Sequence, residues 1–327
     1  MSSGPPEKLT AAARELVEGE YRMTVARIAH LATHSNVLYR VDLTDGRRLV
    51  LRVGRSAMGT RRNLELEVAW LSELVADPDI NVAEPVATPD GRRVVDLDDG
   101  EGVRACVLFT WVPGEPMGAG AGTSGYRAMG RLSALLHRHG DWRPEDSDTL
   151  RRWDRTFYYS PEIEPVALNL PRYDHLFDEV RPLLRRIADQ VDQTLELLWS
   201  TDTPMVVHGD LHEWNVHLYM GRAWAIDFED TMLAFPAQDV ATSLYGARTR
   251  SDLPAVIEAF RSGYEEHRPW PVAAHADLEL YWAARQVMLM NHAACILSET
   301  QARQFFDRVM PWLRGYADRR PGRHTGG

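Results

Sequence analysis

A Gly- and Pro-rich stretch at residues 112–125, VPGEPMGAGAGTSG, separates two different patterns of apolar residues. Before it, short β-branched and aliphatic runs alternate with turn residues, which is typical of strands. After it, apolar residues recur mostly at helical spacing. The length of 327 residues suits two lobes that share a cleft better than one compact domain. We therefore expect an N-terminal lobe at residues 1–112, a C-terminal lobe at residues 113–327 and a hinge between them.

The N-terminal part predicts a small antiparallel sheet with one helix packed on it, preceded by an N-terminal helix. VARIAHL, VLYRVDL and RLVLRVG have strand composition, and DGR provides a turn before the third. RRNLELEVAWLSELVA places Leu64, Val68, Leu71 and Val75 on one helical stripe. NVAEPVAT, VVDL and VRACVLFTWV predict further strands. The expected order is three strands, a helix and then more strands.

The C-terminal part predicts amphipathic helices with a single interruption. The helical segments are 126–140, 173–200, 254–267, 276–299 and 300–319. The interruption is PMVVHGDLHEWNVHLYMGRAWAIDFED at residues 204–230, where short strands alternate with tight loops. The chain is therefore expected to be of the α+β class, with its chemistry in a small β-rich island of the helical lobe.

Composition excludes several classes of partner. The net charge is −10 with a sequence pI near 5.7, and no run of Lys or Arg offers a basic face to nucleic acid. No apolar run approaches membrane-spanning length, and the first residues lack the pattern of a signal peptide. Cys106 and Cys295 lie in apolar surroundings and cannot form a disulfide framework. We expect a cytoplasmic protein without a nucleic-acid or membrane partner.

The stretch VVHGDLHEWNV at residues 206–216 admits two chemistries. His208 and His212 are four residues apart, which on a helix would place two imidazoles on one face for a metal. However, Gly209 is a poor helix former and the preceding PMVV favours a strand. A zinc hydrolase of the H-E-x-x-H type also requires Glu directly after the first His. The sequence therefore disfavours the zinc interpretation.

The alternative is phosphoryl transfer, which needs a carboxylate beside the acceptor hydroxyl and hard oxygen ligands for Mg²⁺. Asp210 supplies a base, and Asn215 supplies a neutral oxygen ligand on the same loop. Asp227 follows an apolar strand, and a hairpin with a Met-Gly-Arg turn would bring it back beside Asn215. The three residues predict a site for a hard cation.

These residues resemble the motifs of the aminoglycoside phosphotransferase and choline kinase-like family, which has the two-lobed protein-kinase-like fold. The shared motifs are H-G-D-x-x-x-x-N, then I-D-F, then a Pro and a later Asp-Val-Ala, here at Pro236 and Asp239. The resemblance implies ATP and Mg²⁺ as cofactors, with Asp210 as catalytic base and Asn215 and Asp227 as metal ligands. It implies that Asp239, and with it His208, positions the catalytic loop.

The same resemblance places the nucleotide on the N-terminal lobe. The family has a Lys on the third strand and a Glu on the next helix, and here Arg52 stands in the place of that Lys. Glu67 is its expected partner, with Glu65 second; the alternative is that Arg52 is an exposed strand residue. The backbone amides of Ser35 and Asn36 are expected to approach the phosphates. The Thr110 carbonyl and the Val112 amide are expected to bind adenine, although a guanine nucleotide would fit the same segment.

The acceptor is the least constrained part. Glu213, Glu229 and Asp230 lie near the catalytic motifs and would suit a cationic acceptor, or they are loop charges or a bracing network. Tyr158 could stack on a sugar ring, or it belongs to the core. The leading hypothesis is a kinase of a small hydroxylated molecule such as an aminoglycoside, amino alcohol, sugar or homoserine-like metabolite. The alternatives are a protein Ser/Thr kinase of the stress-response type, although no activation loop supports it, and a nucleotide-binding protein without catalysis, because of Arg52.

Overall fold

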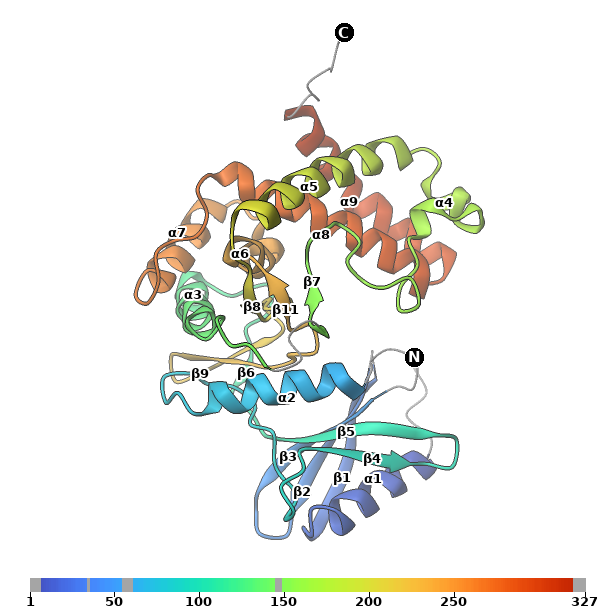
Figure 1. The fold of residues 1–327 in the computed structure, drawn as a ribbon, viewed down its shortest axis with the longest axis vertical. Coiled ribbons are helices and arrows are strands. Elements are labelled where there is room, and N and C mark those ends of the chain that lie inside the picture. Colours follow the sequence, from blue (N-terminus) through green and yellow to red (C-terminus); the bar gives the residue numbers. More distant parts are fainter. Residues whose placement is uncertain (1–6, 34–35, 55–60, 145–148, 320–327) are drawn as a thin grey trace. The chain divides into compact units, whose positions relative to one another are not determined.

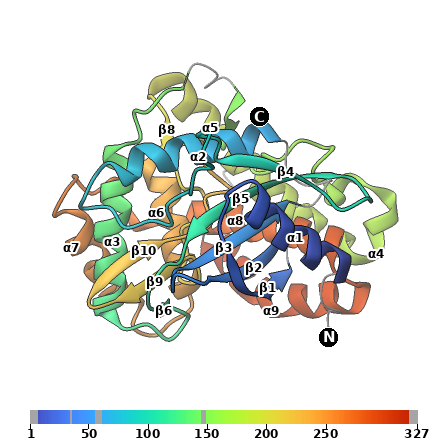
Figure 2. The same ribbon diagram turned by 90° about the horizontal axis from the view of Figure 1, so that it is seen from below.

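The structure is a computed structural model that describes residues 7–33, 36–54, 61–144 and 149–319. It divides into two compact units, drawn together in Figures 1 and 2. Unit 1 consists of Met1–Met117, Trp142–Leu150 and Trp214–Asp230. Unit 2 consists of Gly118–Asp141, Arg151–Glu213 and Thr231–Gly327. The chain thus passes from unit 2 into unit 1 and back within the β-rich island.

Unit 1 contains a five-stranded antiparallel sheet in the order β1-β2-β3-β5-β4. Its strands are β1 (Val25–Thr33), β2 (Asn36–Leu43), β3 (Arg48–Gly54), β4 (Val94–Asp98) and β5 (Val103–Thr110). Two helices accompany it, α1 (Glu7–Gly19) and α2 (Arg61–Val75). The predicted succession of three strands, a helix and further strands is confirmed.

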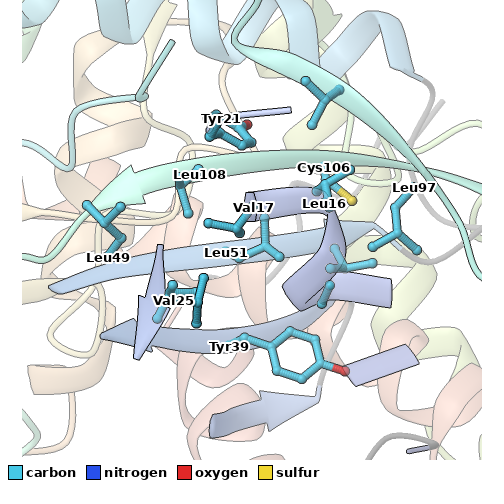
Figure 3. Close-up of a cluster of buried hydrophobic side chains, with 14 of the residues drawn as sticks. Leu16, Val17, Tyr21, Val25, Tyr39, Leu49, Leu51, Leu97, Cys106 and Leu108 are labelled. Carbon is cyan, nitrogen blue, oxygen red and sulfur yellow. The ribbon is translucent and has the colours of Figure 1, made fainter. Parts of the chain in front are cut away.

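The alternation of side chains along the strands gives this sheet two different faces. In β3, Leu49, Leu51 and Val53 join a cluster of buried side chains that includes Leu16 and Val17 of α1, part of which Figure 3 shows. Successive strand residues point to opposite faces, so the residues between these three face away from α1. Arg52 is one of them. One face of the sheet therefore forms a closed core, and the other is available for a site.

Two predictions for this unit were wrong in detail. The segment NVAEPVAT forms only isolated bridges, Val82 with Ala225 and Pro85 with Phe109, because a proline lacks the N–H that a strand ladder needs. The buried face of α2 is displaced from the predicted stripe: Val68 and Leu71 are buried, but Leu64 and Val75 are only partly buried, and Leu66, Trp70 and Leu74 are buried instead.

A second, three-stranded sheet belongs to unit 1 and has the order β10-β9-β6. Its strands are β6 (Glu115–Pro116), β9 (Val216–Tyr219) and β10 (Arg222–Ala225). β9 and β10 form the predicted hairpin, with Tyr219 paired to Arg222. Met220 and Gly221, between the strands, both have positive φ, 49° and 76°, as a two-residue turn of this kind requires.

Unit 2 is mainly helical, with one small sheet in the order β7-β11-β8. Its strands are β7 (Arg151–Arg152), β8 (Met205–Val207) and β11 (Met232–Ala234). Its α-helices are α3 (Thr123–Arg138), α4 (Asp174–Phe177), α5 (Arg181–Thr201), α6 (Pro236–Leu244), α7 (Leu253–Tyr264), α8 (His275–Ile296) and α9 (Glu299–Arg319). Short 3₁₀ turns, Ala167–Asn169, Pro171–Tyr173 and Tyr245–Ala247, connect some of them. α8 packs against α5, α6 and α9, and buried residues occur all along it (Figure 1).

The helices of unit 2 differ from the prediction in two places. The segment 173–200 is interrupted between α4 and α5, where Pro182 at the start of α5 begins a new helix instead of continuing the old one. α6 was not predicted, because its nine residues are too few for a clear periodicity. No helix among the described residues has both the length and the apolarity needed to cross a membrane.

Candidate active site

Unit 1 contains a cavity of about 240 Å³ on the face of the large sheet that α1 leaves free. Leu38, Val50 and Phe109 of the sheet and Leu71 of α2 give it apolar walls. Polar side chains from the sheet, from α2 and from the segment after β10 also line it; they include Arg52, Glu67, Asn36 and Asp227. An apolar cavity with a few convergent polar groups is the usual form of a small-molecule site.

Arg52 is buried in this cavity and is ion-paired with Glu67 of α2. Its guanidinium also lies 5.2 Å from the centre of the Phe109 ring. Burial opposes the charge of Arg52, but the attraction of Glu67 raises its pKa, so it remains a cation. Glu65, the other candidate partner, bonds to Arg61 at 2.9 Å. The sequence thus identified the right pair, and Arg52 is not an exposed strand residue.

Asp227 lies at the same end of the cavity, with its Oδ1 3.7 Å from Arg52 Nη1. Its φ of 64° places a non-glycine residue in the left-handed region, and its side chain is 44% exposed. The neighbouring Ile226 N–H donates to the carbonyl of Asn215 at 3.0 Å. The hairpin therefore returns Asp227 to the level of Asn215, and a carboxylate and an amide oxygen there suit a hard cation such as Mg²⁺.

Asn36, at the start of β2, contacts the segment that follows Asp227. Asn36 Nδ2 donates to Glu229 Oε2 at 2.5 Å, so Glu229 is held beside the sheet of unit 1. Burial raises the pKa of Glu67 against the opposing effect of Arg52, and the negative charges of Glu229 and Asp230 add to the increase. Ser35, the other predicted phosphate contact, lies outside the described residues.

The segment predicted to bind adenine lines the same cavity. Thr110 ends β5, and its N–H and Oγ1 are both bonded to the backbone of Glu84, at 2.9 Å each. Val112 is buried and also lines the cavity. Among the described residues its backbone N–H has no hydrogen-bond partner, which leaves a donor for a ligand.

In unit 2, the loop after β8 is fixed by a buried network. Gly209, with φ 81°, donates its N–H to Asp239 Oδ1 at 2.8 Å. The other carboxylate oxygen of Asp239 contacts His137 Nε2 at 3.0 Å, and His137 Nδ1 contacts the Tyr264 hydroxyl at 2.8 Å. His208 is fully buried, and its Nδ1 accepts the Asp210 N–H at 3.3 Å. These contacts hold the backbone of the loop at Gly209 and Asp210.

Asp210 projects from this loop and binds two partners. It is ion-paired with Arg285 of α8, and its Oδ2 lies 3.3 Å from His212 Nε2. Burial alone would raise the pKa of Asp210, but the Arg285 guanidinium and the His212 imidazole lower it well below its usual range. The sequence could not show the contact with Arg285, because 75 residues separate the two. The side chain of Asp210 is still 24% exposed, which leaves access for a substrate.

The remaining acceptor candidates of unit 2 lie around this pair. Glu213 is buried against Gly246, where an added Cβ would lie 2.1 Å from Glu213 Oε1, so it is not a solvated loop charge. Tyr158 packs on Trp153 and Tyr159, with ring centres 5.6 and 4.9 Å away, and its phenol lies close enough to Arg285 to influence the pKa of that guanidinium. Tyr158 therefore combines a packing role with a place near the Asp210–Arg285 pair.

The two-histidine metal site is not formed. Residues 208–212 are not helical, and His208 and His212 contact different atoms of Asp210. Within the described ranges no group of three or more His, Cys, Asp or Glu side chains could hold a metal. The predicted pair of oxygen ligands, Asn215 and Asp227, would not need such a group, since nucleotide phosphate oxygens also bind Mg²⁺ in phosphoryl transfer.

Comparison with known proteins identifies the family of this chain. The model of the phosphotransferase enzyme family matches residues 27–275. An uncharacterized protein of Deinococcus radiodurans is 28% identical over 314 residues, 93% of this chain and 89% of that protein.

Solved structures show the same fold. An amicoumacin kinase in complex with AMP-PNP, Ca²⁺ and Ami has a TM-score of 0.76 at 18% identity, covering 97% of this chain and 95% of that one. A microcompartment-associated aminopropanol kinase has a TM-score of 0.69 at 22% identity, covering 95% and 97%. A spectinomycin phosphotransferase with ADP and spectinomycin has a TM-score of 0.65 at 15% identity, covering 91% and 94%. The predicted kinase-like α+β fold is confirmed.

Proposed function

Because the chain belongs to the phosphotransferase enzyme family, we propose that it transfers the γ-phosphoryl group of ATP to a hydroxyl group of a small molecule. The observation that carries the proposal is the buried Arg52–Glu67 pair in the cavity of unit 1, with Asp227 3.7 Å from Arg52. A fixed cation beside a partly exposed carboxylate is suited to nucleotide phosphates and their metal ion. The structural neighbours, named as small-molecule kinases and in two cases bound to nucleotides, support the same function.

Within this proposal, residues 1–112 form the nucleotide-binding lobe. Arg52 holds phosphate oxygens with its two-pronged guanidinium, and Glu67 fixes its orientation. Asn36 approaches the phosphates, and the Thr110 carbonyl and Val112 N–H bind the adenine edge. Asn215 and Asp227 hold Mg²⁺, which when bound neutralises charge on the phosphate oxygens.

Residues 113–327 form the catalytic and acceptor-binding lobe, with Asp210 as its central group. Asp210 accepts a hydrogen bond from the acceptor hydroxyl and orients its oxygen toward the γ-phosphorus. As the new O–P bond forms and the bond to the β–γ bridging oxygen breaks, the hydroxyl proton passes to Asp210 and ADP leaves. The lowered pKa of Asp210 keeps it ionised but makes it a weak base, so proton transfer comes late in the step. Asp239 and His208 act by holding the loop.

The test combines binding and turnover. The purified protein is incubated with Mg-ATP and a panel of aminoglycosides, amino alcohols, sugars, hydroxy acids and a generic protein, and phosphorylated products are identified by mass spectrometry. Asp210→Asn should reduce product formation by about 10²–10⁴-fold and leave nucleotide binding unchanged. Product from a small molecule that disappears with Asp210→Asn supports the proposal. A protein as the sole acceptor, an Asp210-independent product, or failure to bind nucleotide contradicts it.

A further inference from the structure

Arg248 is a partly buried cation that has no ion pair among the described residues. It follows the 3₁₀ turn Tyr245–Ala247 in unit 2. Its Nη1 donates to the Tyr245 carbonyl at 2.9 Å and its Nη2 to Gln286 Oε1 at 2.8 Å, and both acceptors are neutral. Its guanidinium stacks on Tyr245 at 3.7 Å and lies 5.5 Å from the Trp312 ring. A cation removed from water without an anion is costly, so the site lacks a negative charge.

Two further arginines increase the positive charge here. Arg285 of α8 lies 5.5 Å from the same Tyr245 ring. Burial lowers the pKa of Arg248, and the charges of Arg285 and Arg308 lower it further, whereas Tyr245 and Glu213 act in the opposite direction. Asp210 is already paired with Arg285, and Arg308 is an exposed residue of α9. Glu213 acts on Arg248 electrostatically, but within the described part of the chain no carboxylate lies at ion-pair distance from Arg248.

Unsatisfied donors mark the same place. The Nε atoms of Arg248 and Arg285 and the Nε2 atom of Gln286 are buried and have no hydrogen-bond partner among the residues that the structure describes. Gln286 is fully buried, and its Oε1 is already occupied by the Tyr245 hydroxyl and by Arg248. Leaving a buried donor unpaired is unfavourable, and these three lie on residues grouped around the Tyr245 side chain.

From these observations we infer that the acceptor carries an anionic group, a carboxylate or a phosphate, that binds Arg248 beside the Asp210–Arg285 pair. The inference rests on the proposed function, because it identifies the class of acceptor that Asp210 serves. Arg285 bridges the two parts, since it binds Asp210 with Nη2 and lies over the ring on which Arg248 stacks. A small molecule with a hydroxyl a few atoms from its anionic group would reach both. This charge is opposite to the one expected from Glu213, Glu229 and Asp230.

The experiment compares four compounds on one three-carbon frame: glycerol, D-glycerate, sn-glycerol 3-phosphate and the cationic 2-amino-1,3-propanediol. Binding of each is measured by calorimetry with Mg-AMP-PNP present, so that the nucleotide site is filled and turnover is not needed. At least one of the two anions should bind about tenfold or more tightly than glycerol and the amine. The anion that binds more tightly shows whether the anionic group of the acceptor is a carboxylate or a phosphate.

Three variants test whether the preference for anions depends on Arg248. Arg248→Gln should remove the preference for the anion, and Arg248→Lys should restore part of it. Arg261→Gln, at an exposed arginine of α7 paired with Glu265, is the matched control and should bind as wild type. Thermal unfolding shows whether Arg248→Gln is folded, and the Lys variant carries the test if it is not.

The outcomes separate the two proposals. Equal binding of all four compounds, or an anion preference that survives Arg248→Gln, overturns the anion inference. Asp210-dependent transfer to a neutral or cationic acceptor without any anion preference overturns it as well, and leaves the proposed function intact. If the protein does not bind nucleotide, the proposed function fails, and the same titrations without nucleotide still decide whether Arg248 binds anions.

Discussion

Two buried arginines, Arg52 in unit 1 and Arg285 in unit 2, each bind a carboxylate, and the two carboxylates differ in their access to water. The side chain of Glu67 is 3% exposed, whereas that of Asp210 is 24% exposed. The first pair therefore fixes a cation in place and has no free carboxylate surface. The second keeps oxygen lone pairs accessible to a substrate. The same chemical pair can thus serve to position a charge or to present one, and burial of the carboxylate decides which.

The largest expected effect is the loss of stability when the Arg52–Glu67 pair, here called the closed pair because its carboxylate is buried, is broken. Glu67→Gln leaves the Arg52 charge buried without its carboxylate, and we expect the free energy of unfolding to fall by about 3–5 kcal/mol. Urea unfolding of the purified variants measures this. Glu65→Gln, at a partly exposed residue of the same helix, is the control and should change stability by less than about 0.5 kcal/mol. If the two variants were equally stable, the buried pair would not have the role described.

The Asp210–Arg285 pair, here called the open pair because water reaches its carboxylate, should be less sensitive to substitution. Asp210→Asn should lower the free energy of unfolding by only about 1–3 kcal/mol, because the amide oxygen still accepts a hydrogen bond from Arg285 and water reaches the side chain. The same urea series provides the comparison. A loss as large as that of Glu67→Gln would remove the distinction between the two pairs.

The pH dependence of the open pair has a definite sign. The pKa of Asp210 is lowered in the folded state, so the unfolded chain binds its proton more readily. Its contribution is fully present above the unfolded pKa of about 3.9 and is lost as pH falls below it, by up to about 1.4 kcal/mol per pH unit. The difference in the free energy of unfolding between wild type and Asp210→Asn should therefore be retained near neutral pH. It should shrink below about pH 4. A difference that grew on acidification would contradict the lowered pKa.

The smallest effect concerns the identity of the cation in the closed pair. Arg52→Lys retains the charge beside Glu67 and loses one prong of the guanidinium, so we expect nucleotide affinity to change by less than about tenfold. Calorimetry with Mg-AMP-PNP measures the affinity. Arg52→Met, which removes the charge, should weaken binding by considerably more. Equal affinities for the Met and Lys variants would show that this cation does not contact the phosphates.

Local patterns were enough to predict much of the fold. The β-branched run of β3 and the Met-Gly turn predicted their elements, because the signals lie within a few residues. Arg52 and Glu67 were paired correctly, since a strand and the helix that follows it pack together. α6 was missed, although Pro236 at its start and Gln238, which accepts the Phe235 N–H at 2.9 Å, are start signals that could have identified it.

The acceptor side could not be predicted in the same way. The sequence predicts that Arg285 lies in an amphipathic helix, where a charge is usually a solvated surface residue. Its contact with Asp210 depends on the packing of α8 against distant elements. Arg248 is equally ordinary in the sequence. Its significance comes from the charges that surround it after folding, which no spacing along the chain records. Sequence motifs therefore predicted Asp210 as the base, whereas the structure was needed to see the charges around that residue.

The left-handed backbone of Asp227 has an evolutionary consequence. A glycine at this position would adopt its φ of 64° without steric cost and would relieve strain on the order of 1 kcal/mol. The same change would delete the carboxylate. In a library of variants, Asp227→Gly would thus score as neutral or beneficial for cellular abundance and as deleterious for catalysis. An aspartate with this backbone conformation would therefore contribute to the proposed metal site at the expense of stability.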